Sequence, residues 1–381
     1  MELRLTSDQE LFAESTRKFM EDKCSVTDLR ALRDDPDGFV PDVWRQGAEL
    51  GWTSLLVSEE DGGGSFSGAP VKDAALLAYE FGRQAAAGPF LPANLVGAAL
   101  SRWGTDEQKA EVLSGLLDGS VVASWAWAEP RPHDRLGEVA LTATPADGGY
   151  RLSGAKSPVE AGGQSSHLLV TARTPGGLTN FLVPRDSSGV SVTPMKGLDL
   201  TRRWARIDFD GVTVPASAVV GEVDGAEPNV EELLQLALVL QSAEVTGAMS
   251  RCLEITVEWA FNRYTFGRPL ASYQALKHRF ADMRSWLEAG EAIADEAADR
   301  VQEQSPRAGE YVSAAKAFLG VYGPELAHDC VQMHGGIGTT YELDLHLYLR
   351  RVILGNRLYG TVSEHRQRLT NILEQRETTH A

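Results

Sequence analysis

The stretch "RYTFGRPLASYQAL" (residues 263–276) separates two long segments of helical apolar spacing and decides how the fold is interpreted. Arg263, Thr265, Phe266 and Gln274 lie around the break between the two predicted helices. An arginine guanidinium can bind a pyrophosphate as a forked donor. An arginine beside an aromatic residue is more often simply solvated. This stretch therefore indicates a phosphate-binding site only in combination with other motifs.

A second motif is the glycine pair in "QMHGGIGTTYE" (residues 332–342). Gly335 and Gly336 allow a backbone to approach a ligand closely and can offer N–H groups to a phosphate. Gln332 precedes the pair, and "LYGT" (residues 358–361) follows the next predicted helix. A glycine pair at a helix end is usually only a cap, so this motif is also weak alone.

Length, composition and charge limit the class of protein. The 381 residues are enough for two or three domains, and 43% hydrophobic with 23% charged residues is an ordinary globular composition. The formal net charge of -17 opposes binding to nucleic acid or to an anionic membrane, because phosphates would be repelled. A small anionic ligand stays compatible with this charge, since it responds to a local patch.

Cysteine usage and hydropathy favour a cytoplasmic location. Cys24, Cys252 and Cys330 lie far apart and form no C-x-x-C pair, which fits a reducing compartment. The N-terminus has no apolar signal-peptide core. The longest apolar stretch, residues 233–249, is interrupted by glutamine and glutamate, so we expect a buried helix rather than a membrane span. No metal site is expected.

Residues 1–117 are predicted to form a helical domain. Ser7 and Glu10 match a capping box before an apolar run, and Thr105 with Gln108 repeats the pattern. The glycine-rich "DGGGSFSG" (residues 61–68) could cradle a phosphate, but no lysine follows it and no βαβ unit surrounds it. We therefore expect a plain turn at this position.

Residues 118–226 are predicted to form a compact antiparallel β domain. Between about Val121 and Glu222, short β-rich segments are separated at regular spacing by Gly, Pro, Asp and Ser. No internal repeat and no low-complexity linker interrupts the chain. The change from helical spacing to short β-rich segments in the middle of the chain predicts a fold that is mostly α with a central antiparallel β domain.

Residues 227–381 are predicted to form a second helical domain. From about Pro228 the apolar spacing indicates one long helix that runs to the Arg263 stretch. Further helices are expected at about residues 273–304, at 308–333 and from 344 onward.

Taken together and in this order, the motifs resemble the acyl-CoA dehydrogenase family. "RYTFGRPLASYQAL" looks like the family's R-x-T-F-G…Q-A stretch, "QMHGGIGTTYE" like its Q-x-x-G-G-x-G segment, and the "AEP" of residues 128–130 like its T-E-P loop. The resemblance covers essentially the whole chain and implies a helical N-domain, a β-barrel middle domain and a four-helix C-domain. It also implies FAD, a dimer-of-dimers tetramer and α,β-dehydrogenation of an acyl-CoA thioester.

The resemblance implies a role for each motif residue. In the family one FAD is held by two chains, and the neighbouring chain donates the R-x-T-F-G and Q-x-x-G-G elements to the pyrophosphate and adenosine end. Both donated motifs are intact in this chain. The residues expected to bind the cofactor are Arg263, Thr265, Phe266, Gln274, Gln332, Gly335, Gly336 and Thr361.

The catalytic base implied by the resemblance is missing. In the family a glutamate of a Y-E-G-T motif removes the α-proton, which needs a carboxylate because the α-C–H is only weakly acidic. Tyr359 falls at that position, and a phenol with a pKa of about 10 is a poor base near neutral pH. We expect Tyr359 to pack over the flavin or to fill the pocket. Other members carry the base on the long helix, where this chain has Ala237.

Glu244 is the alternative base. It lies two turns after Ala237, on nearly the same face of the predicted helix and between apolar neighbours. A buried carboxylate there could have a raised pKa and face the acyl pocket. The other interpretation is a structural glutamate that is paired across an interface.

The residues implied for the chain's own flavin ring are also altered. The T-E-P threonine is Ala128, the loop after it has become Arg131–Arg135, and the family's W-I-T segment appears as Pro158-Val159-Glu160. Random decay should not alter this set while it spares both donated motifs. A subunit that completes another chain's flavin site should show this pattern.

Three interpretations are compatible with the sequence. The first is a non-catalytic partner subunit in an α2β2 heterotetramer with a homologous chain, acting on a bulky acyl-CoA such as a steroid side chain. The second is a homomeric dehydrogenase, dimer or tetramer, in which Glu244 is the base. The third is another flavin reaction on the same fold, oxidation or monooxygenation, in which Tyr359 is an acid or a packing group.

Overall fold

The computed structural model describes residues 5–130, 136 and 139–380. By their contacts these residues form two compact units. The helical unit contains the N-terminal segment to Leu29, Ala75–Ala86 and the chain from Leu238, and the sheet unit contains Arg30–Ala74 and Ala87–Ala237. The domain boundaries expected near residues 117 and 226 stay a prediction.

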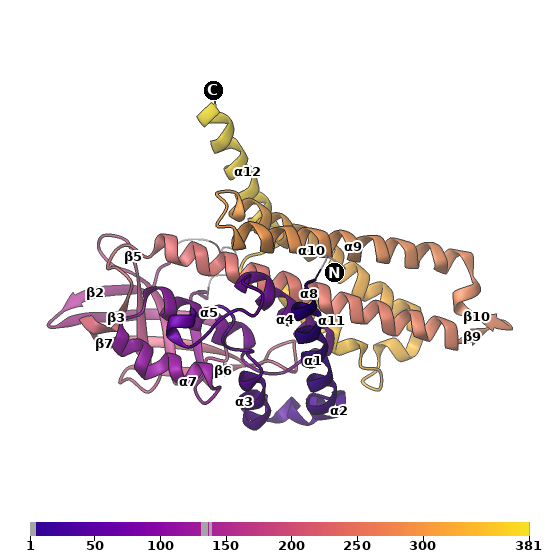
Figure 1. The fold of residues 1–381 in the computed structure, drawn as a ribbon, viewed down its shortest axis with the longest axis horizontal. Coiled ribbons are helices and arrows are strands. Elements are labelled where there is room, and N and C mark those ends of the chain that lie inside the picture. Colours follow the sequence, from indigo (N-terminus) through magenta and orange to yellow (C-terminus); the bar gives the residue numbers. More distant parts are fainter. Residues whose placement is uncertain (1–4, 131–135, 137–138, 381) are drawn as a thin grey trace. The chain divides into compact units, whose positions relative to one another are not determined.

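The helical unit is organised around α10, which packs against α9, α11 and α12 (Figure 1). The predicted long helix is confirmed, since α8 is continuous over 36 residues. A two-stranded hairpin joins α8 to α9 at one end of the unit. The elements are α8 (Glu227–Asn262), β9 (Tyr264–Thr265), β10 (Arg268–Pro269), α9 (Gln274–Gln302), α10 (Ala308–His334), α11 (Leu345–Gly355) and α12 (Val362–His380).

The chain up to residue 117 is helical over its described residues, as expected. Its helices are α1 (Ser7–Lys23), α2 (Val26–Ala31), α3 (Pro41–Glu49), α4 (Pro70–Gln84), α5 (Phe90–Trp103), α6 (Asp106–Gln108) and α7 (Ser114–Leu117). Short helical turns over the described chain are η1 (Leu32–Asp34), η2 (Glu59–Asp61), η3 (Lys109–Leu113), η4 (Ala216–Ala218), η5 (Leu270–Ser272) and η6 (Gly335–Thr339).

The capping box of α1 differs from the prediction by one residue. Thr6 is the N-cap, and its side chain accepts from the backbone of Gln9 while the Gln9 side chain accepts from the Thr6 backbone. The predicted Ser7–Glu10 pair is therefore wrong. Both pairs match the pattern, but the earlier start buries Gln9 and leaves the charged Glu10 in solvent. The box at Thr105 and Gln108 is confirmed.

The glycine-rich segment at residues 61–68 forms the expected turn. Gly62 and Gly68 take positive φ angles of 87° and 78°. The hydroxyl groups of Ser65 and Ser67 donate to the carboxylate of Asp73 at the start of α4. These hydroxyls therefore stabilise the turn itself.

The sheet unit carries one mainly antiparallel sheet, which confirms the central β domain. Its strand order is β6-β7-β3-β2-β4-β5-β8. β1 also pairs with β4, and this pairing is parallel, which the long segment between the two strands allows. The strands are β1 (Ala123–Ala126), β2 (Thr142–Ala146), β3 (Gly149–Glu160), β4 (His167–Arg173), β5 (Leu178–Pro184), β6 (Val190–Met195), β7 (Trp204–Pro215) and β8 (Val219–Val220).

The sheet core explains why the segments fold as strands. Apolar side chains of β3, β4, β5 and β7, including Leu152, Val170, Phe181 and Ile207, are fully buried in one cluster. Burial of such side chains contributes about 1.5–3 kcal/mol each. α5 packs on β1 and covers this strand within the same unit.

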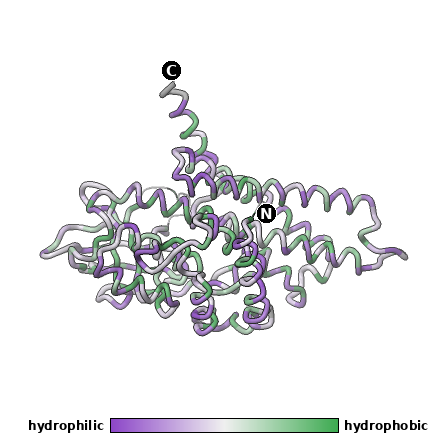
Figure 2. Tube along the Cα trace, in the orientation of Figure 1, coloured by the Kyte–Doolittle hydropathy of each residue, from purple (hydrophilic) through white to green (hydrophobic). Residues whose placement is uncertain are grey.

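Hydrophilic residues interrupt the apolar ones along the long helices (Figure 2). Among the described residues, no helix is both apolar enough and long enough to cross a bilayer.

Candidate functional site

The hairpin between α8 and α9 presents the first predicted cofactor motif. Phe266 and Gly267 form its two-residue turn, with φ angles of 51° and 79°. Two successive positive φ angles match the twist of a hairpin, and glycine at the second position meets that need without strain. Phe266 is 94% exposed, so the tip makes almost no contact within this chain.

Tyr273 fixes the base of this hairpin. Its hydroxyl donates to the carbonyl oxygen of Thr265 at 2.7 Å, and the guanidinium carbon of Arg268 lies 3.9 Å from its ring centroid. The hairpin is thus rigid although its tip is exposed. Tyr273 was not predicted as a site residue; the available sequence signal was an aromatic residue directly before a helix that follows a turn.

The second predicted motif follows α10. Gly335 has a φ of 64°, and a Cβ atom added at Gly335 or Gly336 would meet nothing within 4 Å. Gln332 is exposed on the last turn of α10, and Gln274 is exposed on the first turn of α9. The glycine turn is therefore open to a ligand, which is necessary if its backbone N–H groups are to bind an anion.

Trp259 connects the two motifs. The guanidinium carbon of Arg263 lies 5.7 Å from the Trp259 ring centroid. Trp259 also stacks on His334, with ring centroids 5.2 Å apart and 28° between the planes. Neither Trp259 nor His334 was predicted as a site residue, because the contact joins helix ends 75 residues apart in sequence.

Tyr359 lies in the connection between α11 and α12. Its φ is 56°, an uncommon value for a residue with a bulky side chain. The His365 ring donates through Nε2 to the Tyr359 carbonyl oxygen at 2.8 Å, and its Nδ1 lies 3.2 Å from the Ser313 hydroxyl. Burial lowers the pKa of His365 to about 4, so the ring is neutral at pH 7.

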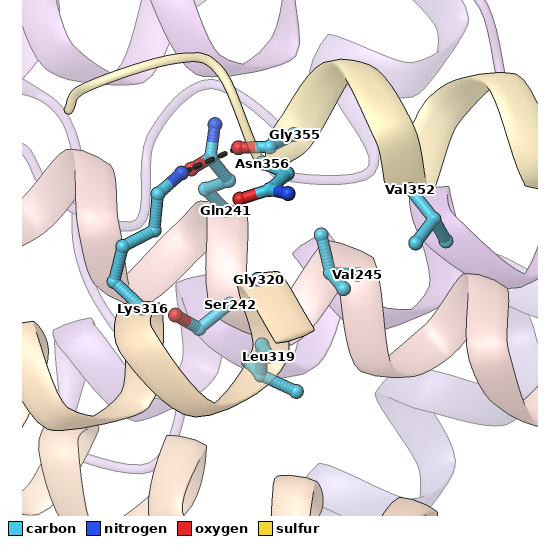
Figure 3. A pocket seen from close by; sticks show the side chains of 9 residues that line it. All are labelled: Gln241, Ser242, Val245, Lys316, Leu319, Gly320, Val352, Gly355 and Asn356. Atoms are coloured by element: carbon cyan, nitrogen blue, oxygen red, sulfur yellow. Dashed lines mark hydrogen bonds between the residues drawn. The ribbon is translucent and has the colours of Figure 1, made fainter. Parts of the chain in front are cut away.

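Lys316 holds the same connection from α10. Its ammonium group donates to the carbonyl oxygens of Gly355 and Leu358, the latter at 2.7 Å, and to the side chain of Gln241 (Figure 3). Lys316 is only 4% exposed, and three donors meet three acceptors. The loop that carries Tyr359 is therefore fixed by buried hydrogen bonds on both sides.

A small cavity lies beside Lys316. It has a volume of about 10 Å³, which is near the lower limit for one water molecule. An acyl chain does not fit this space. Its lining comes from α8, α10 and the end of α11 and comprises Gln241, Ser242, Val245, Lys316, Leu319, Gly320, Val352, Gly355 and Asn356 (Figure 3).

Thr361 caps α12. Its backbone N–H donates to a carboxylate oxygen of Glu364 at 2.6 Å, and the Glu364 backbone N–H lies 3.4 Å from the Thr361 hydroxyl oxygen. This is a capping box. The hydroxyl proton of Thr361 remains able to donate to a ligand, so the predicted cofactor role is compatible with the cap.

Glu244 lies in a buried ion pair. Its carboxylate is 3.0 Å from the guanidinium of Arg351, and both side chains are 2% exposed. Arg351 also donates to the carbonyl oxygens of Ala85 and Ala86 at 3.2 and 2.9 Å. The environment of Glu244 is that of a paired structural glutamate, the second of the two interpretations of this residue. Ala237 is fully buried.

In the sheet unit, the two altered segments lie side by side. The Ser157 backbone N–H donates to the carbonyl oxygen of Ala128 at 2.7 Å, which places Pro158 and its neighbours next to the "AEP" segment. Trp125 and Trp127 stack on each other before this segment, with ring centroids 5.3 Å apart. The loop Arg131–Arg135 lies outside the described residues.

Glu129 anchors this region electrostatically. Its carboxylate accepts from Lys156 at 3.0 Å and from the backbone N–H groups of Ala140 and Leu141 at 2.9 Å. Burial alone would raise the pKa of Glu129, but the Lys156 ammonium and these N–H groups outweigh it, so the pKa is lowered. Lys156 is fully buried and also donates to the Trp127 carbonyl oxygen.

A buried ion pair lies at the position of the family's W-I-T threonine. Nε of Arg202 is 3.4 Å from a carboxylate oxygen of Glu160, and the two side chains are 5% and 6% exposed. Val159 beside it is 1% exposed. Arg202 was not predicted; the arginine pair before β7 was its only sequence signal.

Comparison with protein families fits this architecture. The model described as "Acyl-CoA dehydrogenase, N-terminal domain" matches residues 6–120, and "Acyl-CoA dehydrogenase, C-terminal domain" matches residues 229–371. The chain belongs to the acyl-CoA dehydrogenase family. The predicted fold class is confirmed, as is the oxidoreductase class acting on CH–CH groups. Acyl-CoA dehydrogenases are FAD flavoproteins, so the expected cofactor is confirmed at the level of the family.

Relatives extend over almost the whole chain. Acyl-CoA dehydrogenase IpdE2 of Mycolicibacterium smegmatis is 28% identical over 96% of this chain and 98% of its own length. IpdE2 of Mycobacterium tuberculosis is 29% identical over 90% of each chain. The acyl-CoA dehydrogenase similarity is therefore not confined to one domain.

Two solved structures are similar in fold and above 25% in sequence identity. A chain of the Tcur3481–Tcur3483 steroid ACAD has a TM-score of 0.89 and 26% identity, covering 97% of this chain and 99% of that one. A chain of the ChsE4–ChsE5 complex from Mycobacterium tuberculosis has a TM-score of 0.88 and 27% identity, covering 97% and 98%.

Proposed function

We propose that this chain is the non-catalytic partner subunit of a heteromeric, FAD-dependent acyl-CoA dehydrogenase. In this role it completes a flavin site whose ring and catalytic base belong to a homologous chain. Two of the similar solved structures are named as pairs of different chains, which supports the heteromeric arrangement.

One contrast carries the proposal. The motifs that would serve another chain are exposed and unobstructed, as Phe266 and the Gly335–Gly336 turn illustrate. Of the residues that would serve the chain's own flavin, Val159 and Glu160 are buried, and Glu160 is paired with the buried Arg202. A site that had lost its ligand by chance should have lost both halves equally.

The chemistry of the candidate bases supports the same role. FAD, when bound, supplies the acceptor for the hydride removed from the acyl group. The α-proton must go to a positioned base of suitable pKa. Tyr359 offers a phenol, and Glu244 already faces Arg351 at 3.0 Å. At the two positions where the family resemblance places the base, the chain has Tyr359 and Ala237, and the carboxylate of the alternative, Glu244, is already paired.

The substrate class follows from the relatives. One similar structure is named a steroid ACAD. We infer that the complex acts on a bulky acyl-CoA thioester, such as a steroid side chain, during its breakdown. A cytoplasmic location belongs to this proposal: Cys24, Cys252 and Cys330 are all free thiols buried in the fold, as a reducing compartment favours.

The test is purification of the chain alone and together with a homologous chain that carries a glutamate base. We expect the chain alone to be colourless and inactive with a steroid side-chain CoA thioester and a ferrocenium acceptor. The complex should be yellow, with half as many FAD molecules as chains. Tyr359→Glu in the chain alone should stay inactive, because the altered flavin-ring residues remain. A yellow and active lone chain would refute the proposal.

A further inference from the structure

We infer that Trp259 is a positioning residue for the dinucleotide held by the partner subunit: its indole fixes the Arg263 guanidinium beside the His334–Gly335 turn. The inference rests on the proposed function and assigns a residue outside the family motifs. It comes from the described contacts at the ends of α8 and α10 alone.

The first contact orients the arginine. The backbone N–H of Arg263 donates to the Trp259 carbonyl oxygen at 2.8 Å and closes the last turn of α8. The guanidinium carbon then lies 5.7 Å from the indole centroid, within the range of a cation–π contact. Arg263 is otherwise exposed, and a free arginine side chain loses considerable rotamer entropy when it binds a ligand.

The second contact fixes the glycine turn relative to that arginine. The indole stacks on His334 at 5.2 Å between centroids. His334 is 5% exposed, and its Nδ1 donates to the Cys330 carbonyl oxygen at 2.7 Å, so the ring cannot rotate freely. Gly335 follows directly. The position of the glycine turn is thereby linked to the end of α8.

The indole N–H of Trp259 and the Nε2 atom of His334 take no part in this link. In the described part of the chain, Trp259 Nε1 and His334 Nε2 have no hydrogen-bond partner. The indole therefore acts through its ring faces. Burial lowers the pKa of His334, so its ring is neutral at pH 7 and does not repel the guanidinium.

Preorganisation gives this link a function. Arg263 and the glycine turn come from different helices, and one pyrophosphate must meet both. A guanidinium already held in place loses less freedom on binding, which strengthens affinity without a new contact. Trp259 would thus raise FAD affinity although it need not touch the cofactor.

The experiment measures FAD affinity of the purified heteromeric complex after flavin removal, by titration of flavin fluorescence. Trp259→Leu should raise the Kd for FAD about threefold to tenfold, the size expected for a lost cation–π contact with its ordering effect. Trp259→Phe, which keeps an aromatic face, should stay within about twofold of the parent. If Trp259→Leu does not assemble, Trp259→Met replaces it with the same expectation.

Trp286 on α9 is the matched control. It carries the same kinds of contact, with the guanidinium carbon of Arg279 4.9 Å from its ring centroid and the Tyr322 ring 5.5 Å away, and neither of these two partners is a predicted cofactor residue. Trp286→Leu should leave the Kd for FAD unchanged. An equal rise in both tryptophan variants would overturn the inference, because it would indicate general destabilisation.

A double-mutant cycle separates the possible failures. If Trp259 acts through Arg263, the double variant should bind FAD no more weakly than Arg263→Ala alone. Additive losses of FAD affinity in the double variant would overturn this inference and leave the proposed function standing. The same holds if Trp259→Leu leaves the Kd for FAD unchanged while Arg263→Ala raises it. An unchanged Kd in Arg263→Ala would instead reject the proposed function.

Discussion

The carboxylate of Glu244 lies 3.0 Å from the guanidinium of Arg351, and both side chains are almost completely buried. This pair joins α8 to α11, and Arg351 extends the link to the end of α4 through the carbonyl oxygens of Ala85 and Ala86. The helices are in close contact here: a Cβ atom at Gly82 of α4 would lie 1.9 Å from the Glu244 carbonyl oxygen. Glu244 is thus the counter-charge of a structural arginine.

Glu244→Gln should therefore destabilise the fold. The variant removes the carboxylate that lies 3.0 Å from the buried Arg351 guanidinium, and loss of one partner of a buried ion pair costs about 3–5 kcal/mol in the free energy of unfolding. Urea unfolding followed by circular dichroism measures this loss. Glu258→Gln, at an exposed glutamate of the same helix, is the control and should change stability by less than about 0.5 kcal/mol.

The opposite result would change the interpretation of Glu244. Parent-like stability in Glu244→Gln, combined with a loss of turnover of about a hundredfold or more in an active preparation, would identify Glu244 as a general base.

Lys316→Met should loosen the Tyr359 loop. The variant removes the donor to the carbonyl oxygens of Gly355 and Leu358, and each buried acceptor without a partner costs about 1–3 kcal/mol. Hydrogen exchange of the backbone between residues 356 and 361 should become faster. The exposed Lys277 offers the control: Lys277→Met should leave exchange in this loop unchanged.

The His365 ring should make stability depend on pH. Burial lowers its pKa from 6.5 to about 4, so between these values the unfolded chain binds a proton that the folded chain does not. Stability contributed by the neutral ring is then present above pH 6.5 and is lost as the pH falls toward 4, by about 3 kcal/mol in all.

His365→Gln should flatten this dependence, because glutamine can still donate to the Tyr359 carbonyl oxygen but does not titrate. The free energy of unfolding, measured at pH 7.0 and 5.0, should differ less in this variant than in the parent. His328→Gln, at an exposed histidine of α10, should keep the parental difference. If the free energy of unfolding of His365→Gln changes with pH as much as that of the parent, His365 is not the group responsible for the pH dependence.

The fold could be predicted where the signal is local and long. The apolar spacing of α8 persists over 36 residues, so its existence was secure. The capping box at Thr105 was also predicted, because a single capping-box pattern fits the sequence there. At α1 two overlapping patterns fit, at Thr6 and at Ser7, and only burial of Gln9 decides between them.

The candidate site was less predictable because its contacts join distant segments. Glu244 stands out in the sequence, but its partner Arg351 is 107 residues away and belongs to no motif. The stack of Trp259 on His334 depends on how two helix ends meet. The motif residues themselves were predictable from the family resemblance, and their cofactor roles stay predictions.

The last prediction compares Arg263→Ala with Tyr359→Ala in the co-purified heteromeric complex. A charge-assisted hydrogen bond contributes roughly 1.5–3 kcal/mol, which corresponds to about one to two decades of affinity. Arg263→Ala should therefore lower the FAD content per complex, read from the flavin absorbance after gel filtration in flavin-free buffer. Tyr359→Ala should keep the parental FAD content, because Lys316 and His365 hold the loop through the backbone carbonyl oxygens of Leu358 and Tyr359, which the variant keeps. Equal loss in both variants would return Tyr359 to the flavin-binding residues, and an unchanged content in Arg263→Ala would reject the donated half-site.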